Sequence, residues 1–314
     1  MNVALQQQQS FARGMLVDVV GEESLRLALE LCREHLDLVY FPTSIQGELC
    51  NRFPESPIRV FCYPSEEDPQ YFFMVKDNLY IKPYLMLAHV PDTKFDRISY
   101  LECLREFRMR ALGALDSNRP HLMVGKENLI KLYSTLMHNV VHDLTSTNLC
   151  LNLFYMDDQQ REAILSHKAT LPIGYVYSEL DPDEEAEVVN KTWQHAKDGD
   201  LEQTHAKLRR MPSSCVRTDC GRPVAFEMID PAGFMNNQYV YETHRRKGLG
   251  TAVEVKLAQK CIRHGMVPFK TVDKRNTVAL NASVSSPFWT VWRDEQGKAV
   301  TVVFQEWQMT PKTA

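Results

Sequence analysis

The sequence predicts a mixed α/β (α+β) fold made of two domains. Apolar residues at helical spacing alternate along the chain with short runs rich in β-branched and aromatic residues. The chain has 314 residues, enough for two domains of ordinary size, and 44% of them are hydrophobic, enough for packed cores. The boundary falls between Asp157 and Thr170, which gives an N-terminal domain over residues 1–160 and a C-terminal domain over residues 161–314.

The first half begins with a helical pattern over Glu23–Leu36 and continues into short apolar runs that indicate strands. The expected strands are "SIQGELCNRF", "IRVFCYP" and two within "YFFMVKDNLYIKPYLMLAHV", where Asp77-Asn78 suits a hairpin turn. Helical patterns over Arg97–Ala114 and Lys126–Val140 follow, and "CLNLFYM" indicates a buried strand. This order of helix, strands, helices and strand is typical of a mixed α/β unit.

The second half has its own sequence of elements. Two helices are expected, "DPDEEAEVVNKTWQHA" with acidic residues at its start, and "LEQTHAKLRRM". Strands follow at "CVRT", "RPVAFEMID" and "GFMNNQYVY", then a helix that Gly265 ends, a strand at "PFKTVD" and a final hairpin, "FWTVWRDEQGKAVTVVFQEWQ".

Charge and composition exclude several classes of protein. The net charge of -4 argues against a general nucleic-acid binder, and no apolar run is long enough to cross a membrane. The N-terminus lacks the features of a secretory signal, but up to Asp18 it holds one Arg and no acid. We therefore expect an intracellular protein, in the mitochondrion or the cytoplasm. The eight cysteines form no CxxC pair, so reduced, mostly buried thiols and no metal site are expected.

One short stretch carries chemistry of its own. "YETHRRKGLGTAVEVKLAQKCIRHG" places Arg245, Arg246 and Lys247 directly before Gly248 and Gly250, at the start of an amphipathic helix. The first N–H groups of a helix have no partner within it, and glycines let an oxyanion approach them. The pattern predicts a pocket for a phosphate or pyrophosphate, with a solvated basic turn as the alternative. It is neither GxGxxG nor a P-loop.

The pattern R-x-x-G-x-G, formed by Arg245, Gly248 and Gly250, resembles the acyl-CoA loop of the GNAT acyltransferase superfamily. Within it, residues 171–276 resemble the glycine N-acyltransferase family through six segments in order: "LPIGYVYSEL", "VVNKTWQHA", "MPSSCV", "GRPVAFEMID", "HRRKGLG" and "VDKRN". The first half resembles that family's N-terminal domain only through "SIQGELCNRF" and "IRVFCYP". The resemblance implies tandem GNAT-like domains, each a twisted mixed sheet flanked by helices, with the first a degenerate companion.

The resemblance also implies how the second domain works. Its central strands splay apart and hold acyl-CoA, with the pantetheine arm along the strand around Phe234–Tyr241, and the amine of an amino acid such as glycine attacks the thioester. The implied acyl-CoA-binding residues are Tyr239, Val240, Tyr241, Arg245, Arg246, Lys247, Gly248, Leu249, Gly250, Thr251 and Asn276. For Asn276 an alternative is to cap the next helix. Only small-molecule partners are expected, with no metal, nucleic acid or membrane.

The catalytic base is the point of departure from the family. Phe234 stands where the mammalian enzymes carry a glutamate, and a phenyl ring cannot accept a proton. Glu227, Glu242, His244 or a water relayed to a backbone carbonyl could replace it. Three hypotheses follow: an acyl-CoA:amino-acid N-acyltransferase of the glycine type, a non-catalytic protein that binds CoA or acyl-CoA, and an interaction protein that keeps only the fold.

Overall fold

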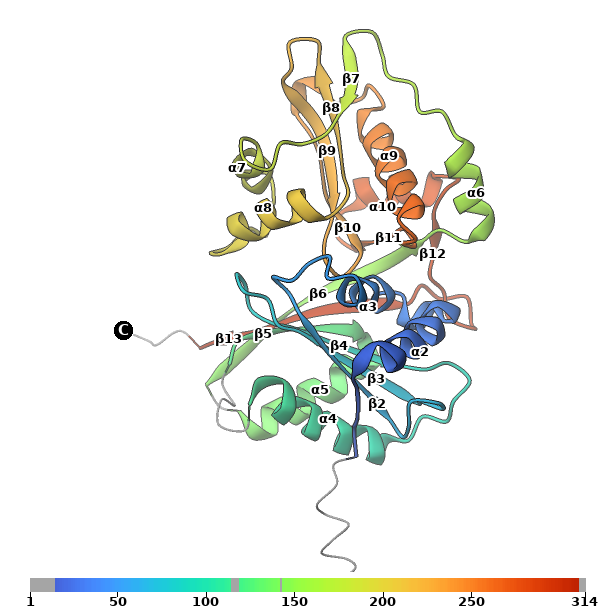
Figure 1. Ribbon diagram of the computed structural model, residues 1–314, viewed down its shortest axis with the longest axis vertical. Coiled ribbons are helices and arrows are strands. Elements are labelled where there is room, and N and C mark those ends of the chain that lie inside the picture. The colour runs from blue at the N-terminus through green and yellow to red at the C-terminus, as the bar shows by residue number, and fades with distance from the viewer. Residues whose placement is uncertain (1–14, 114–118, 142, 311–314) are drawn as a thin grey trace, which may run out of the picture.

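The computed structural model describes residues 15–113, 119–141 and 143–310. One continuous mixed sheet of 13 strands runs through this part of the chain, with helices on both faces (Figure 1). From one edge to the other the strands follow the order β1-β2-β3-β4-β5-β13-β6-β11-β10-β9-β8-β7, and β12 lies beside β6. Most of the N-terminal segment considered above for targeting lies outside the described residues.

The first half of the chain supplies one end of this sheet. Its strands are β1 (Val17–Val19), β2 (Ile58–Tyr63), β3 (Tyr71–Lys76), β4 (Tyr84–His89), β5 (His121–Lys126) and β6 (Leu144–Tyr155). Its helices are α2 (Gly21–Glu34), the 3-10 turn η1 (Leu36–Leu38), α3 (Pro42–Leu49), α4 (Arg97–Leu112) and α5 (Glu127–Val140). Apolar residues of α4 and α5 pack on one face of the strands, and those of α2, η1 and the segment that enters α3 pack on the other.

The second half supplies the other end of the sheet. Its strands are β7 (Tyr175–Ser178), β8 (Ser213–Thr218), β9 (Pro223–Ile229), β10 (Phe234–Val240), β11 (Phe269–Asp273), β12 (Thr290–Val291) and β13 (Thr301–Met309). Its helices are α6 (Asp158–Ser166), α7 (Ala186–Lys191), α8 (Asp200–Arg210), the 3-10 turn η2 (Glu242–His244), α9 (Leu249–Arg263) and α10 (Thr277–Ser285). Apolar residues of α6, α9 and α10 contribute to one core, and those of α7 and α8 pack against the opposite face of β9.

The two ends of the sheet repeat the same order. Starting from either edge, neighbouring strands are antiparallel until one parallel pair, β4 with β5 or β10 with β11. Both ends then reach the long antiparallel pair of β6 and β13, in which Met309 lies opposite Leu144 and Thr301 opposite Asn152. These two strands cross the middle of the molecule (Figure 1) and belong to both ends of the sheet. A division of the chain at residue 160 therefore stays a prediction.

Several sequence predictions need correction. "SIQGELCNRF" is not a strand: its first part lies in α3, which has Pro42 in its first turn, a position that needs no N–H donor. The helix expected over Asp181–Ala196 is reduced to α7, because the Asp181 carboxylate accepts from the backbone N–H groups of residues 183 and 184 and forms a turn first. The final hairpin turns at Asp294, but β13 pairs with β5 and β6 and not with β12.

Other predictions of secondary structure and of cysteine burial are confirmed. β3 and β4 form the expected antiparallel hairpin, α9 ends where Gly265 adopts a positive φ of 72°, and α4 and α5 occupy the expected ranges, although Ala114 lies outside the described residues. Five of the eight cysteines are buried, and all eight are free thiols. Within the described ranges, no helix combines the length and the apolar content that a bilayer crossing requires.

Candidate functional site

The parallel pair β10–β11 opens into a gap. The two strands are paired only at Phe234 with Phe269 and at Met235 with Lys270, although β10 continues to Val240. On its other side β10 stays paired with β9, apart from an irregularity where Asn237 adopts a positive φ of 50°. One edge of β10 is therefore free of a neighbouring strand from Asn236 onward, within the described part of the sheet. This is the splayed arrangement that the sequence resemblance implied.

The basic-glycine loop lies at the far end of β10. Arg246 and Gly248 both have positive φ values, of 59° and 76°, which bend the loop into the start of α9. Gly248 is the N-cap and provides no capping side chain. The N–H groups of the first turn, at the positive end of the helix dipole, therefore have no side-chain partner from the cap. Arg245, Arg246, Lys247, Gly248 and Thr251 are exposed, whereas Leu249 is buried and fixes the helix to the sheet.

The loop is held against β10 by close contacts. The Arg245 Nε donates to the Val240 carbonyl over 3.0 Å, and a Cβ on Gly250 would lie 3.5 Å from the Val240 side chain. The Lys247 ammonium donates to the Tyr175 hydroxyl over 2.8 Å. The arrangement is an exposed, positively charged helix start beside a free strand edge, and it suits an extended ligand that carries a phosphate group at one end.

Two of the predicted base candidates lie at this loop. His244 contacts the Tyr175 hydroxyl through Nδ1 over 2.9 Å, and Glu242 is exposed and forms an ion pair of 3.5 Å with Arg245. At about 3.3 Å per strand residue, they are roughly 20 Å along the chain from Asn236, where the gap opens. The structure therefore groups both side chains with the basic-glycine loop.

Glu227 lies deep in the sheet instead, only 2% exposed. Its carboxyl group accepts from the Gln238 amide over 3.3 Å, and the same amide also reaches the Gly250 carbonyl and the Glu254 carboxylate. Glu254 in turn is ion-paired with Lys270 and accepts from the Trp289 indole over 2.9 Å. Burial, and then the nearby Glu254, raises the pKa of Glu227 well above its ordinary value, so this group holds its proton to a higher pH.

A further carboxyl group, Asp230, lies where β10 begins. Its Oδ1 accepts from the Ala232 and Phe234 backbone N–H groups over 2.8 and 3.1 Å, and burial raises its pKa. Asp230 belongs to the segment "GRPVAFEMID", but it was not among the residues predicted for the site. The signal was present in the sequence, since Asp230 follows a buried strand and precedes the Pro-Ala-Gly turn that leads into β10.

The side chain of Phe234 itself is buried in an aromatic cluster. Its ring packs against those of Phe269, Phe304 and Tyr40, with centroids 4.8, 5.3 and 6.2 Å away. Tyr40 comes from the first half of the chain, so Phe234 serves as a packing residue between the two halves.

The remaining predicted residues have mixed environments. Tyr239 stacks on Phe226 with a centroid distance of 5.8 Å and lies edge-on to Tyr241, on the face that α7 and α8 cover. Asn276 caps α10, since its Oδ1 accepts from the Ala279 N–H over 3.1 Å, which matches the alternative considered for it. Among the described residues, no group of three His, Cys, Asp or Glu side chains could hold a metal ion.

Comparison with solved structures identifies the fold. A Drosophila protein solved by X-ray crystallography aligns over 96% of this chain and 100% of its own, with a TM-score of 0.71 and 13% identity. A tandem GNAT protein from the clavulanic acid biosynthesis pathway, solved without AcCoA, has a TM-score of 0.51 at 13% identity, over 95% of this chain and 99% of its own. A GCN5-related N-acetyltransferase from Kribbella flavida has a TM-score of 0.51 at 16% identity, over 88% and 98%.

No family model matches the sequence. At these identities the structural likenesses concern the fold alone. This chain therefore has the fold of the GNAT acyltransferases over nearly its whole length, as the sequence resemblance implied. The particular family within that fold, glycine N-acyltransferase, stays a prediction.

Proposed function

We propose that this protein is an acyl-CoA-dependent N-acyltransferase that acts on the amine of an amino acid of the glycine type. One observation carries the proposal: the uncapped, basic start of α9 lies at the end of β10, the strand that diverges from its parallel neighbour. A ligand with a pyrophosphate and a long, amide-containing arm fits both features. The helix start and Arg245, Arg246 and Lys247 suit the phosphates, and the free edge of β10 suits the amides.

In this proposal the thioester carbonyl lies near Asn236, where β10 and β11 part. The amine nitrogen forms a bond to the carbonyl carbon and the carbon–sulfur bond breaks. A carboxylate of the chain accepts the proton that the amine loses and passes it to the thiolate. The chain contributes chiefly by positioning, and backbone N–H groups at the irregular part of β10 are suited to stabilise the developing oxyanion.

The proton acceptor in the proposal is a buried carboxyl group. Glu242 and His244 lie at the anion-binding end, whereas Glu227 and Asp230 lie on and after β9, close to the opening of the gap. A carboxylate whose pKa is raised is a stronger base near neutral pH than an exposed one, because its pKa lies closer to the pH of the solution. Both carboxyl groups have this property.

The first test is thermal unfolding of the protein with CoA, acetyl-CoA and benzoyl-CoA. A ligand at about 100 times its dissociation constant stabilises the folded state by roughly 2.7 kcal/mol. Gly248→Glu puts a carboxylate at the start of α9 and is expected to abolish the shift. Gly297→Glu is the matched control, because Gly297 has nearly the same φ, 75°, and no atom within 4 Å of the place a Cβ would take, yet lies in a distant turn. An equal loss of the shift in both variants would contradict the anion site.

The second test is release of CoA thiol from acyl-CoA in the presence of glycine and other amino acids. Turnover that needs both substrates supports the transferase. A second function, CoA binding without catalysis, is favoured by the apolar surroundings of Phe234. It predicts the thermal shift with no thiol release for any pair of substrates. No shift with any CoA compound would exclude both.

A further inference from the structure

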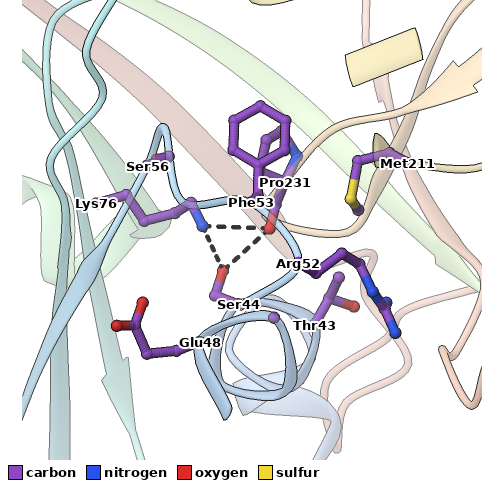
Figure 2. Close-up of a pocket in the computed structure, with 10 residues that line it drawn as sticks. Thr43, Ser44, Glu48, Arg52, Phe53, Ser56, Lys76, Met211 and Pro231 are labelled. Atoms are coloured by element: carbon purple, nitrogen blue, oxygen red, sulfur yellow. Dashed lines mark hydrogen bonds between the residues drawn. The ribbon is translucent and has the colours of Figure 1, made fainter. Parts of the chain in front are cut away.

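Two small adjoining cavities lie where the two halves of the chain meet. Both are lined by Ser56, Lys76 and Pro231. The first continues along α3 toward Met211 (Figure 2), and the second continues toward Tyr84, Gln203, Asp230 and Ala232. Each has a volume of about 10 Å³, room for a group the size of one water molecule. Together the cavities offer two adjacent positions for two small polar atoms.

Lys76, at the end of β3, is a buried cation without a direct ion pair, although the carboxyl groups of Glu48 and Asp230 line the same cavities. It is 5% exposed, and its Nζ donates only to neutral acceptors, the Ser44 hydroxyl over 3.1 Å and the Pro231 carbonyl over 3.2 Å (Figure 2). No acidic side chain of the described residues lies within ion-pair distance of it. Burial lowers its pKa to about 8, which still leaves the ammonium mostly charged at neutral pH. An ammonium buried without a direct ion pair is costly, and an anionic ligand in contact with it would offset that cost.

Ser56 is a second, independent sign of a missing partner. The residue is 3% exposed, and its hydroxyl is buried with no hydrogen-bond partner. Buried hydroxyl groups in folded proteins nearly always have one. Because Ser56 lines both cavities together with Lys76, a cationic donor and an unused hydroxyl donor border the same space. A small carboxylate, with two oxygens that accept hydrogen bonds, satisfies both.

The second cavity also connects this space to the proposed reaction centre. Its wall includes Asp230 and Ala232, in the turn that leads into Phe234, where the β10–β11 pair begins and then parts. The Asn236 amide lies 3.5 Å from the Asp230 carboxylate, and its own carbonyl oxygen is buried without a partner. A cation from the first half thus borders one side of the space and an acidic group from the second half borders the other. These two charges are complementary to those of a zwitterion such as an α-amino acid, with its carboxylate toward Lys76 and its amine toward Asp230.

We infer that Lys76 and Ser56 bind the carboxylate of the amino-acid acceptor, with its amine directed toward Asp230 and the gap in the sheet. The inference rests on the proposed function and deepens it. Residues from the first half of the chain would then select the acceptor, and residues from the second half would hold the acyl donor. With the Lys76 side chain in its present position, the cavities hold only water-sized groups. To admit the ligand, the side chain must turn away from Ser44 and toward the ligand.

The test is thermal unfolding of the full chain with four probes at equal ionic strength: glycine, acetate, glycinamide and chloride. Acetate and glycine carry the carboxylate, glycinamide carries only the amine, and chloride is a simple anion. We expect saturable stabilisation by glycine and acetate, and none by glycinamide or chloride. In Lys76→Met the apparent dissociation constants for both carboxylates should rise at least tenfold, and in Ser56→Ala about threefold. If thiol release is detected, Lys76→Met should raise the KM for glycine tenfold and leave the KM for acyl-CoA unchanged.

Lys126→Met is the matched control, since Lys126 is a half-buried lysine of the same half that is ion-paired with Asp37. It should bind carboxylates as the wild type does.

Three results would each overturn the inference. They are stabilisation by glycinamide or chloride equal to that by glycine, carboxylate binding that survives Lys76→Met, and the absence of any carboxylate effect on the wild type. A CoA-induced shift without a carboxylate effect would overturn it and leave the proposed function standing. A carboxylate effect without a CoA-induced shift would overturn the proposed function and leave only a site for small carboxylates. Ser56→Ala, which removes one hydroxyl only, keeps the test decisive if Lys76→Met fails to fold.

Discussion

The two halves of the molecule have the same strand order but different helix starts. In the first half α4 begins at Asp96, whose carboxylate accepts from the N–H groups of Ile98 and Ser99 over 2.7 and 3.3 Å. In the second half α9 begins at Gly248, which has no side chain to use in this way. A capped helix start satisfies its own N–H groups and repels anions, whereas an uncapped one can bind them. The difference lies in one residue at an equivalent place in the fold.

The strand edge before each helix differs as well. In the first half the Tyr40 hydroxyl donates to the Leu87 carbonyl on β4 over 2.8 Å, and Gly125 lies so close that a Cβ would be 3.0 Å from the same oxygen. Side chain and backbone thus occupy that edge. In the second half β10 and β11 separate after two paired positions. The proposed ligand site thus lies in the half that lacks both the helix cap and the groups that fill the strand edge.

The two halves also differ in their buried ionisable groups. Glu227, in the second half, should have the largest effect on how stability depends on pH. Its native pKa is raised, so the folded state binds more protons than the unfolded state above about pH 4.5, and stability falls as pH rises from there to the native pKa. Glu227→Gln carries no titrating group and should be more stable than the wild type at pH 8, with the difference vanishing near pH 4. Denaturant unfolding at a series of pH values measures this.

Glu242→Gln is the control for Glu227, because it makes the same exchange of carboxyl for amide at an exposed position and should not reproduce the gain in stability at pH 8. Parallel stability curves for wild type and Glu227→Gln would show that Glu227 is ionised in the folded state.

His121 in the first half should give the opposite slope. It is fully buried between the Arg119 carbonyl and the Tyr133 hydroxyl, and burial lowers its pKa to about 4 from an ordinary 6.5. The unfolded state binds more protons in this window, so stability rises from pH 4 to 6.5, by at most about 3 kcal/mol, and is complete above it. His121→Gln should reduce this change in the free energy of unfolding between pH 4 and 6.5, which the same denaturant series measures.

His195→Gln, at an exposed position, is the control and should keep the change. If His121→Gln keeps it too, groups other than His121 cause the loss of stability at low pH.

The smallest effect is expected at the capped helix. Asp96→Ala removes the cap of α4 and should lower the free energy of unfolding by about 1 kcal/mol, with no gain of CoA binding, because Tyr40 still occupies the strand edge. Asp198→Ala, at an exposed position, should change neither quantity. A larger CoA-induced thermal shift in Asp96→Ala would contradict this explanation, since the helix cap alone would then account for the difference between the halves.

Local sequence patterns were sufficient for most helices and for the basic-glycine loop. Gly248, Gly250 and Gly265 mark the limits of α9, and a loop built on backbone N–H groups is visible in consecutive residues. The resemblance, not the periodicity, supplied the splay of β10. The pattern failed at "SIQGELCNRF", where tertiary packing of Ile45 and the start at Pro42 favour a helix over short-range strand propensity.

Long-range features could not be predicted in this way. The insertion of β13 between β5 and β6 depends on pairing across more than a hundred residues, which no local period records. Lys76, Ser56 and Asp230 meet at the junction only after both halves have folded. In sequence, Lys76 stands between the apolar run "YFFMV" and the Asp77-Asn78 turn, where a lysine is expected to mark the exposed end of a strand.

The position of β13 has a consequence for how the chain is made. During synthesis on the ribosome, residues 15–113 and 119–141 emerge well before residues 301–309, yet the sheet of the first half lacks the neighbour of β5 until that late strand arrives. Domains that are contiguous in sequence can fold one after the other as they emerge. Here the first half must wait with an unpaired β5 edge, which is open to incorrect pairing. The acceptor site and the donor site would then be completed together, at the end of translation.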